Sequence, residues 1–259
     1  MLILATILWD IYIVHLARDV PETFFYMKKI MLSLLLLAAI SSTAQQKLFQ
    51  LYKDSASLVE DADKIASTFF SKVKLADASI GLAPTAVINA QPFLIYYSGE
   101  SNTINLPLWS EATPPVKSFF YKMAAGDESE GKKIFGLFFN GFYIGNELGH
   151  AMQFAKEKGM NNKYRGEIFA NTLAILFWRE SGYKKQLEKC YSYVNNMLKI
   201  LPDPVPAGEY QEEYFEKNYD KIVRDPVQYG FFQFSQFKKI YEDKSLTSFS
   251  AFLQNYLRR

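Results

Sequence analysis

The residues with the clearest chemical potential lie in the run GNELGH at positions 145–150, inside a long apolar segment. Asn146 and His150 are four residues apart, so on a helix they share one face, with Glu147 one step round. Two histidines at this spacing would bind zinc, and the glutamate beside the first would act as general base on the zinc-bound water. Asn146 stands at the first of the two positions, so the histidine pair is incomplete.

A second carboxylate follows further along the chain. Glu167 lies seventeen residues after His150, near the start of a helix that we expect over residues 164–181. Residues 158–162 contain glycine and asparagine, which favour a turn. Such a turn would bring the second helix back along the first, so that the Glu167 carboxylate could approach His150.

This arrangement resembles the gluzincin metallopeptidases, the clan of thermolysin, and is most similar to the small exported members of that clan. Their pattern is His-Glu-x-x-His, then a glutamate ligand on a second helix and an aspartate four residues later. The resemblance covers roughly residues 85–180 and implies that His150 and Glu167 are metal ligands and that Glu147 is the catalytic base. Asn146 falls where the other histidine belongs, and Asn171 falls where the family has an aspartate that orients a ligand histidine. A strand expected at residues 103–106 matches the edge strand above such sites.

Asn146 and Asn171, the two departures from the family pattern, affect the same part of the expected zinc site, namely one ligand histidine and the aspartate that orients it. If structural zinc contributes about 10–16 kcal/mol in all, one ligand accounts for about 3–4 kcal/mol. Asparagine offers a neutral, hard oxygen that suits calcium or magnesium better than zinc, and residues 45–259 contain no histidine besides His150. The sequence therefore predicts weak zinc binding, with Asn146 a poor third ligand, and low or absent proteolysis.

Each of these residues also has an ordinary structural explanation. A glutamate three residues before a histidine often occurs by chance, and a lone histidine on an apolar helix is commonly a hydrogen-bonded core residue. A glutamate near a helix start, as Glu167 is, favours the helix dipole. Three functions stay open: an exported metallopeptidase with an altered ligand set, an inactive relative that binds a peptide or protein partner, and an unrelated helical protein.

Other candidate catalytic groups are weaker. Cys190 lies in a pattern typical of a helix surface, where His150 would have to serve as its base, and the sequence has no Gly-x-Ser-x-Gly motif. The aromatic residues between 210 and 237 favour a core role over a stacking platform. The family resemblance also implies a downstream residue that stabilises the oxyanion, for which the candidates are Tyr214, Tyr219, Arg224 and Tyr229.

The elements that must position these residues are mostly helices. Apolar residues recur at helical spacing over residues 54–74, and short β-type runs at 86–88, 93–97 and 103–106 predict a small sheet. Pro114 begins the next helix, and the apolar segment 132–157 predicts one long central helix. Further helices are expected over residues 164–181, 183–200, 209–222, 226–241 and 246–258.

Together these features predict a mostly helical α+β fold of zincin type. Its parts are a small edge β-sheet, a central active-site helix, a helix that bears Glu167, and a C-terminal helical subdomain. Residues 45–259 are enough for a single domain with a sizeable core.

The first 44 residues predict export. Lys28 and Lys29 precede a short apolar run at residues 30–40, and residues 42–44 provide the small side chains of a cleavage site. We therefore expect residues 27–44 to be a signal peptide and the mature chain to begin near Gln45, in the periplasm or outside the cell. Because signal peptides lie at the true N-terminus, we interpret residues 1–26 as a misassigned upstream extension.

Charge and cysteine content exclude several functions. The chain has 29 basic and 27 acidic residues, and cleavage after Ala44 would remove three of each, so the net charge stays at +2. This balance gives no footprint for nucleic acid or an anionic membrane, and we expect no stable membrane anchor after cleavage. Cys190 is the one cysteine of the sequence, so the chain can form no internal disulfide.

Overall fold

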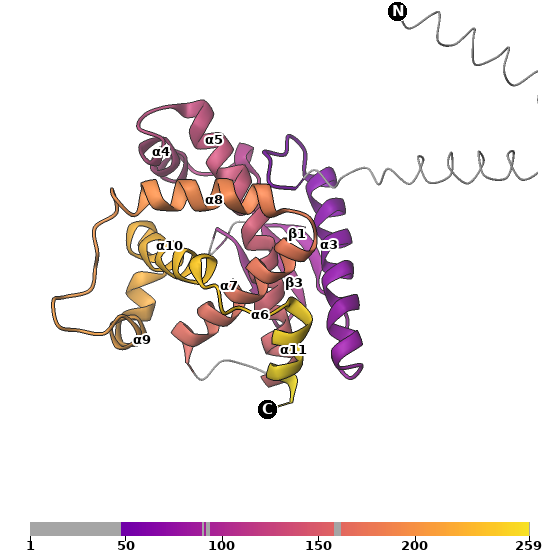
Figure 1. Cartoon of the computed structure of the whole chain (residues 1–259). Helices are drawn as coiled ribbons and strands as arrows, with labels where there is room; N and C mark the ends of the chain where they lie inside the picture. Colours follow the sequence, from indigo (N-terminus) through magenta and orange to yellow (C-terminus); the bar gives the residue numbers. More distant parts are fainter. Residues whose placement is uncertain (1–47, 90, 92–93, 158–161, 259) are drawn as a thin grey trace, which may run out of the picture. The chain divides into compact units, whose positions relative to one another are not determined.

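The computed structural model describes residues 48–89, 91, 94–157 and 162–258, which belong to one compact unit. The expected signal peptide at 27–44 and the upstream extension at 1–26 lie outside the described residues, as does most of the expected turn at 158–162. The described part is a mostly helical α+β fold with a small three-stranded mixed sheet (Figure 1). The expectation of a helical α+β chain with a small sheet is therefore confirmed.

The sheet has the strand order β1-β3-β2. Strand β1 (Thr85–Ile88) runs parallel to β3 (Thr103–Leu106), and β2 (Tyr96–Ser98) runs antiparallel to it. The expectation that residues 103–106 form the edge strand is wrong, because β3 is the central strand. The short 99–102 connection folds β2 back beside β3, which leaves the other side of β3 to β1.

The central layer is a pair of tightly packed helices, α6 (Tyr143–Glu157) and α7 (Lys163–Glu180), which lie side by side in Figure 1. Gly149 permits their close approach, because a β-carbon added there would lie 2.8 Å from the Ala170 Cα. The side chain of Asn162 caps α7 by accepting a hydrogen bond from the Arg165 amide at 2.8 Å.

The apolar segment 132–157 does not form one continuous helix. Helix α5 (Glu128–Leu137) is separated from α6 by a π-helical turn, η2 (Phe138–Phe142), in which Asn140 leaves the helical conformation at φ −106° and ψ 21°. The spacing of apolar residues could not reveal this interruption, because the turn consists of phenylalanines, one asparagine and one glycine, and a regular helix can contain all of these residues.

Helix α3 (Ser55–Ala76) covers β1 and contacts the last helix, α11 (Phe249–Leu257). Its start is fixed by Asp54, whose carboxylate accepts from the Ser57 amide at 2.8 Å. One face is buried throughout its length, as the helical spacing predicts. The buried residues are Leu58, Ala62, Ile65, Ala66, Phe69, Phe70 and Val73.

The remaining helices surround this centre. Helix α10 (Pro226–Glu242) packs on α7 and on α8 (Lys184–Met197), and α9 (Gln211–Ile222) packs on α7. Helix α4 (Pro114–Met123) follows a short 3-10 turn, η1 (Trp109–Glu111), and packs on α5. These bounds agree with the expected helices to within a few residues. Along the part that the structure describes, every helix is too short or too polar to cross a lipid bilayer.

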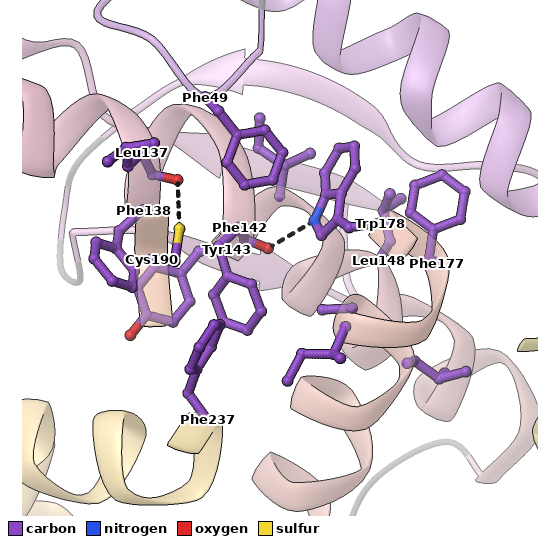
Figure 2. Close-up of a cluster of buried hydrophobic side chains, with 14 of the residues drawn as sticks. Phe49, Leu137, Phe138, Phe142, Tyr143, Leu148, Phe177, Trp178, Cys190 and Phe237 are labelled. Carbon is purple, nitrogen blue, oxygen red and sulfur yellow. Dashed lines mark hydrogen bonds between the residues drawn. The ribbon is translucent and has the colours of Figure 1, made fainter. Parts of the chain in front are cut away.

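Aromatic side chains fill much of the core. Four phenylalanines of α10 are buried, namely Phe231, Phe232, Phe234 and Phe237, so the expected core role is confirmed for them, whereas Tyr210 of the same expected group is 74% exposed. Figure 2 shows Phe237 beside Phe142 and Tyr143, and the Phe237 and Phe142 ring centroids are 4.8 Å apart. Cys190 lies in the same cluster and is fully buried, so the expectation that it lies on a helix surface is wrong.

Candidate functional site

The residues singled out in the sequence come together where α6 packs against α7. Asn146, Glu147 and His150 lie on α6, and Glu167 and Asn171 lie on α7. The His150 Nε2 is 3.4 Å from the Glu167 Oε2. The Asn146 Nδ2 donates a hydrogen bond to the Asn171 Oδ1 at 3.0 Å. Two parallel contacts, one turn apart, therefore connect the helices.

Glu147 is held by the edge of the sheet. The residue is 6% exposed, and its Oε2 accepts a hydrogen bond from the Tyr97 backbone amide of β2 at 2.8 Å. Burial raises the pKa of Glu147 to about 7, against the opposing charge of His150 and with the added repulsion of Glu167. A carboxyl group with this pKa exchanges its proton near neutral pH.

His150 and Glu167 form an ion pair in this protein interior. Burial alone would lower the pKa of His150, but the charge and hydrogen bond of Glu167 outweigh it and raise the pKa to about 9. Burial alone would raise the pKa of Glu167, and the His150 charge reverses that effect, so its pKa lies below the ordinary value. The His150 Nδ1 contacts the Gln153 Oε1 at 3.1 Å, which fixes the ring on its other side.

Helix α10 supplies further partners to Glu167. The Gln233 Nε2 donates to the Glu167 Oε2 at 2.8 Å, and the Tyr229 hydroxyl donates to Oε1 at 3.3 Å. Of the four oxyanion candidates, Tyr229 is the one with a hydrogen bond to Glu167 among the described residues. By contrast, Tyr214 stacks on Phe232, and Tyr219 lies under the Lys163 ammonium group at 4.0 Å.

The second contact between the helices belongs to a chain of amides. Asn171 is fully buried, and its Nδ2 donates to the Gln233 Oε1 at 3.1 Å and to the Gln236 Oε1 at 3.0 Å. Because Asn146 donates to the Oδ1 of Asn171, all polar atoms of the Asn171 side chain have partners. These neutral groups connect α6, α7 and α10.

The residues fit a zinc ion only in part. Two ligands on a tetrahedral zinc are about 3.3–3.5 Å apart, and the 3.4 Å between His150 Nε2 and Glu167 Oε2 matches that separation. A catalytic site needs three protein ligands. The third position holds the Asn146 amide, and nowhere in the described ranges do three or more His, Cys, Asp or Glu side chains gather closely enough to hold a metal. The arrangement does not fit a three-ligand catalytic zinc.

Sequence reasoning missed several members of this cluster. Gln233 and Gln236 lie more than sixty residues from Glu167, within an aromatic segment that indicated only core packing. The Tyr97 contact comes from a backbone amide, which carries no signal of residue type. A buried glutamine on an otherwise apolar helix face was the available indication, because buried amides require partners.

Cys190 has no part in this site. Its thiol contacts the Leu137 carbonyl at 3.9 Å, which is the sulfur–oxygen contact drawn in Figure 2. Burial raises the pKa of the thiol far above its ordinary value, so the thiolate needed for nucleophilic attack is disfavoured.

Two surface hollows of the described part lie away from this cluster. One is lined by Lys163 and by residues 216–221 of α9, and the other by Phe169, residues 245–247 and part of α11. Neither shares a lining residue with the Glu147, His150 and Glu167 cluster.

Comparisons with known proteins identify no relative: no protein-family model, no curated protein and no solved structure matches this chain.

Proposed function

We propose that this chain is an exported, gluzincin-like protein that has lost its catalytic zinc site and acts by binding a peptide or protein partner rather than by cleaving it. A zincin-type arrangement is part of the proposal. It is supported by three contacts already described: α6 against α7, His150 against Glu167, and the antiparallel edge strand β2 against Glu147.

The observation that carries the proposal is the hydrogen bond between Asn146 and Asn171. These are the two positions at which the sequence departs from the family pattern, and they contact each other. In the family pattern a histidine would bind zinc with one nitrogen and donate to the aspartate with the other. Here a neutral amide pair takes over the inter-helix contact, and it supplies no strong zinc ligand.

Hydrolysis by a metal-bound water is disfavoured by the same geometry. Two protein ligands remain, and they satisfy each other as an ion pair at 3.4 Å. Glu147 keeps the position of a general base, but one of its oxygens is used by the Tyr97 amide. Without a third zinc ligand, the fold can still perform one part of the family's activity, which is to bind a peptide or protein partner.

One observation favours a second candidate, a weakly active hydrolase. The pKa of Glu147, raised to about 7, is suited to a general base at neutral pH. This candidate requires a third zinc ligand from outside the described residues or from the substrate, and it predicts hydrolysis that depends on both zinc and Glu147.

A defined peptide mixture distinguishes the two candidates. The purified protein is incubated with a tryptic digest of casein, with and without added zinc, and the bound and free peptides are examined by mass spectrometry. We expect a subset of peptides to be retained uncut, equally by the wild type and by Glu147→Gln. New peptide termini that need zinc and disappear in Glu147→Gln would overturn the proposal in favour of the hydrolase, and retention of no peptide would remove the binding function.

A further inference from the structure

The first described residues, 48–52, form a segment that we call the N-terminal strap. Leu48, Phe49 and Tyr52 are buried, although the strap belongs to no helix or strand. The Tyr52 hydroxyl donates to the Asp61 carboxylate of α3 at 2.6 Å. Lys53 and Asp54, which connect the strap to the first residue of α3, are exposed. The strap is thus a buried segment attached to the domain through an exposed linker.

Two glycines make room for the strap in the surface of the α5–η2 segment. A β-carbon on Gly136 would lie 2.5 Å from the Leu51 amide nitrogen and 2.6 Å from the Gln50 carbonyl carbon. A β-carbon on Gly141 would lie 2.5 Å from the Phe49 ring. Glycine inside a helix is unfavourable in itself. Its presence at these two contacts therefore indicates a recess shaped to the strap.

The backbone of both partners is also distorted at this contact. Phe49 has φ +64°, a left-handed conformation that a bulky residue rarely adopts. Its amide donates to the Asn140 carbonyl at 2.9 Å, and Asn140 is the non-helical residue of the π turn. The turn thus frees a carbonyl that a regular helix would use internally. A strained residue that the surrounding structure holds in place supports the hypothesis that the contact has a function.

The Phe49 ring completes the fit. It packs edge-on against Trp178, with centroids 4.9 Å apart, and stacks on Tyr183 at 5.2 Å. Figure 2 shows the ring beside Trp178, whose Nε1 donates to the Phe142 carbonyl at the end of the π turn. Gly136, Gly141, Trp178 and Tyr183 together define what we call the socket.

We propose that the socket is a binding site for an aromatic-bearing peptide segment, and that the chain's own strap occupies it as a separable latch. The ligand class follows from the contacts: a phenylalanine in a left-handed conformation, whose amide donates to Asn140 and whose ring lies against Gly141, followed by two residues whose backbone lies against Gly136. The socket shares a wall with the candidate site, because a β-carbon on Gly145 would lie 2.5 Å from the Trp178 Nε1. Trp178 therefore contacts both the strap and the helix turn that carries Asn146.

The first test measures amide hydrogen exchange in the intact protein. A latch that opens by itself exchanges its amides through local opening, whereas core amides need global unfolding. We expect residues 48–52 to exchange at least about tenfold faster than the buried turns of α6 and α7. Exchange of the strap at the same rate as these helices would show that it is an inseparable part of the core and would overturn the proposal.

The second test asks whether the socket accepts the strap as a free peptide. A protease site is inserted between Lys53 and Asp54, which leaves the Asp54 cap in place, and the folded protein is then cut. A fluorescent peptide of residues 45–53 should replace the cut strap and bind with one peptide per chain. A peptide with Phe49→Ala should compete at least about tenfold more weakly, whereas Gln50→Ala, at an exposed position, should compete as the native peptide does.

Two results of the second test would overturn the proposal. One is equal competition by the Phe49→Ala and native peptides, which would show that the aromatic ring does not contribute to binding in the socket. The other is a cut protein that remains folded, as judged by circular dichroism, but never exchanges its strap. If the cut protein unfolds instead, the strap is an obligatory part of the fold and the latch is equally refuted.

Discussion

The two edges of the sheet are closed in the same way and yet differ in their surroundings. At the β1 edge, the Asp63 carboxylate of α3 accepts from the Ala86 amide at 2.7 Å. At the β2 edge, the Glu147 carboxylate of α6 accepts from the Tyr97 amide at 2.8 Å. Each carboxylate satisfies an amide that points away from the neighbouring strand, as the edge of a sheet requires.

What lies behind each carboxylate is different. Asp63 is partly buried on a helix whose other face meets solvent. Glu147 is buried beside His150 and Glu167, and its raised pKa shows that its charge is disfavoured there. A simple edge cap needs none of these extra groups. The comparison therefore distinguishes a buried cluster of ionisable side chains at the β2 edge from a single carboxylate cap at the β1 edge.

Glu167→Ala should give the largest loss of stability, because it removes the group that distinguishes the β2 edge. The substitution leaves His150, Tyr229 and Gln233 without their shared acceptor. Breaking one side of a buried ion pair typically costs about 3–5 kcal/mol. The measurement is the free energy of unfolding in urea. Glu60→Ala, which removes an exposed pair with Lys64 on α3, serves as control and should cost less than about 1 kcal/mol. Similar losses in both variants would contradict a special role for the β2 edge.

If the proposed gluzincin relationship holds, the double variant Asn146→His with Asn171→Asp should create a metal site at the β2 edge. The added imidazole would join two donors that already have the separation of zinc ligands, and the aspartate would orient it. We expect zinc affinity, measured by competition with a chelating dye, to rise at least about 100-fold over the unmodified protein. Asn171→Asp alone is the matched control and should gain little, because it has no new histidine to orient. A double variant with unchanged zinc affinity would argue against gluzincin ancestry.

Removing charge at the two edges should have opposite effects. At pH 8, Glu147→Gln keeps a hydrogen-bond acceptor for Tyr97 and abolishes a disfavoured buried charge. We expect it to raise the free energy of unfolding by about 1–2 kcal/mol, since one pKa unit corresponds to about 1.4 kcal/mol. Asp63→Asn replaces a charged acceptor by a neutral one and should lower it by about 0.5–1 kcal/mol. A loss of stability in both variants would mean that the two carboxylates are equivalent caps.

Stability should fall moderately as the pH rises from 6 to 9.5. The pKa of His150 is raised to about 9, so its ion pair contributes fully below the unfolded value of about 6.5 and is lost as the pH rises through 9. The pKa of Glu147 is raised to about 7. The stability that its protonated form provides is therefore lost as the pH rises from the unfolded pKa of about 4.3 through 7, which also lowers the free energy of unfolding. Glu167, with a lowered pKa, opposes this trend only under acidic conditions. Urea unfolding at several pH values should show the decline, and His150→Gln should flatten it above pH 7. A stability that rises over this range would contradict the ion pair.

Much of the fold could be predicted from the sequence, because most of its helices carry an apolar stripe or a cap. The long α3 stripe and the capping residues of α10 and α11 are local signals, and the structure follows them. The π turn could not be predicted from local signals, and the partner of the Asn140 carbonyl that it frees is Phe49, ninety-one residues away in the sequence. The strand order could not be predicted either, because it depends on contacts between residues far apart in the sequence. In the structure, β2 rather than β3 forms the edge beside Glu147.

The candidate site was predictable where the spacing of residues within a helix decides the geometry. Asn146 and His150 share a face because they are four residues apart, and Glu167 and Asn171 do so for the same reason. The partners on α10 were not predictable, because Gln233 and Gln236 gain their meaning only from burial beside Asn171. The buried position of Cys190 was likewise missed, because its flanking lysine and glutamate suggested a solvated face.

The zinc content of the unmodified protein tests the central claim most directly. The purified protein is incubated with an equimolar amount of zinc, desalted, and analysed by inductively coupled plasma mass spectrometry. The amide pair of Asn146 and Asn171 leaves zinc with two ligands, so we expect far less than one zinc ion per chain and no change in melting temperature on adding zinc or a chelator. One tightly held zinc ion per chain, whose removal lowers the melting temperature, would contradict the claim that these amides have replaced the metal.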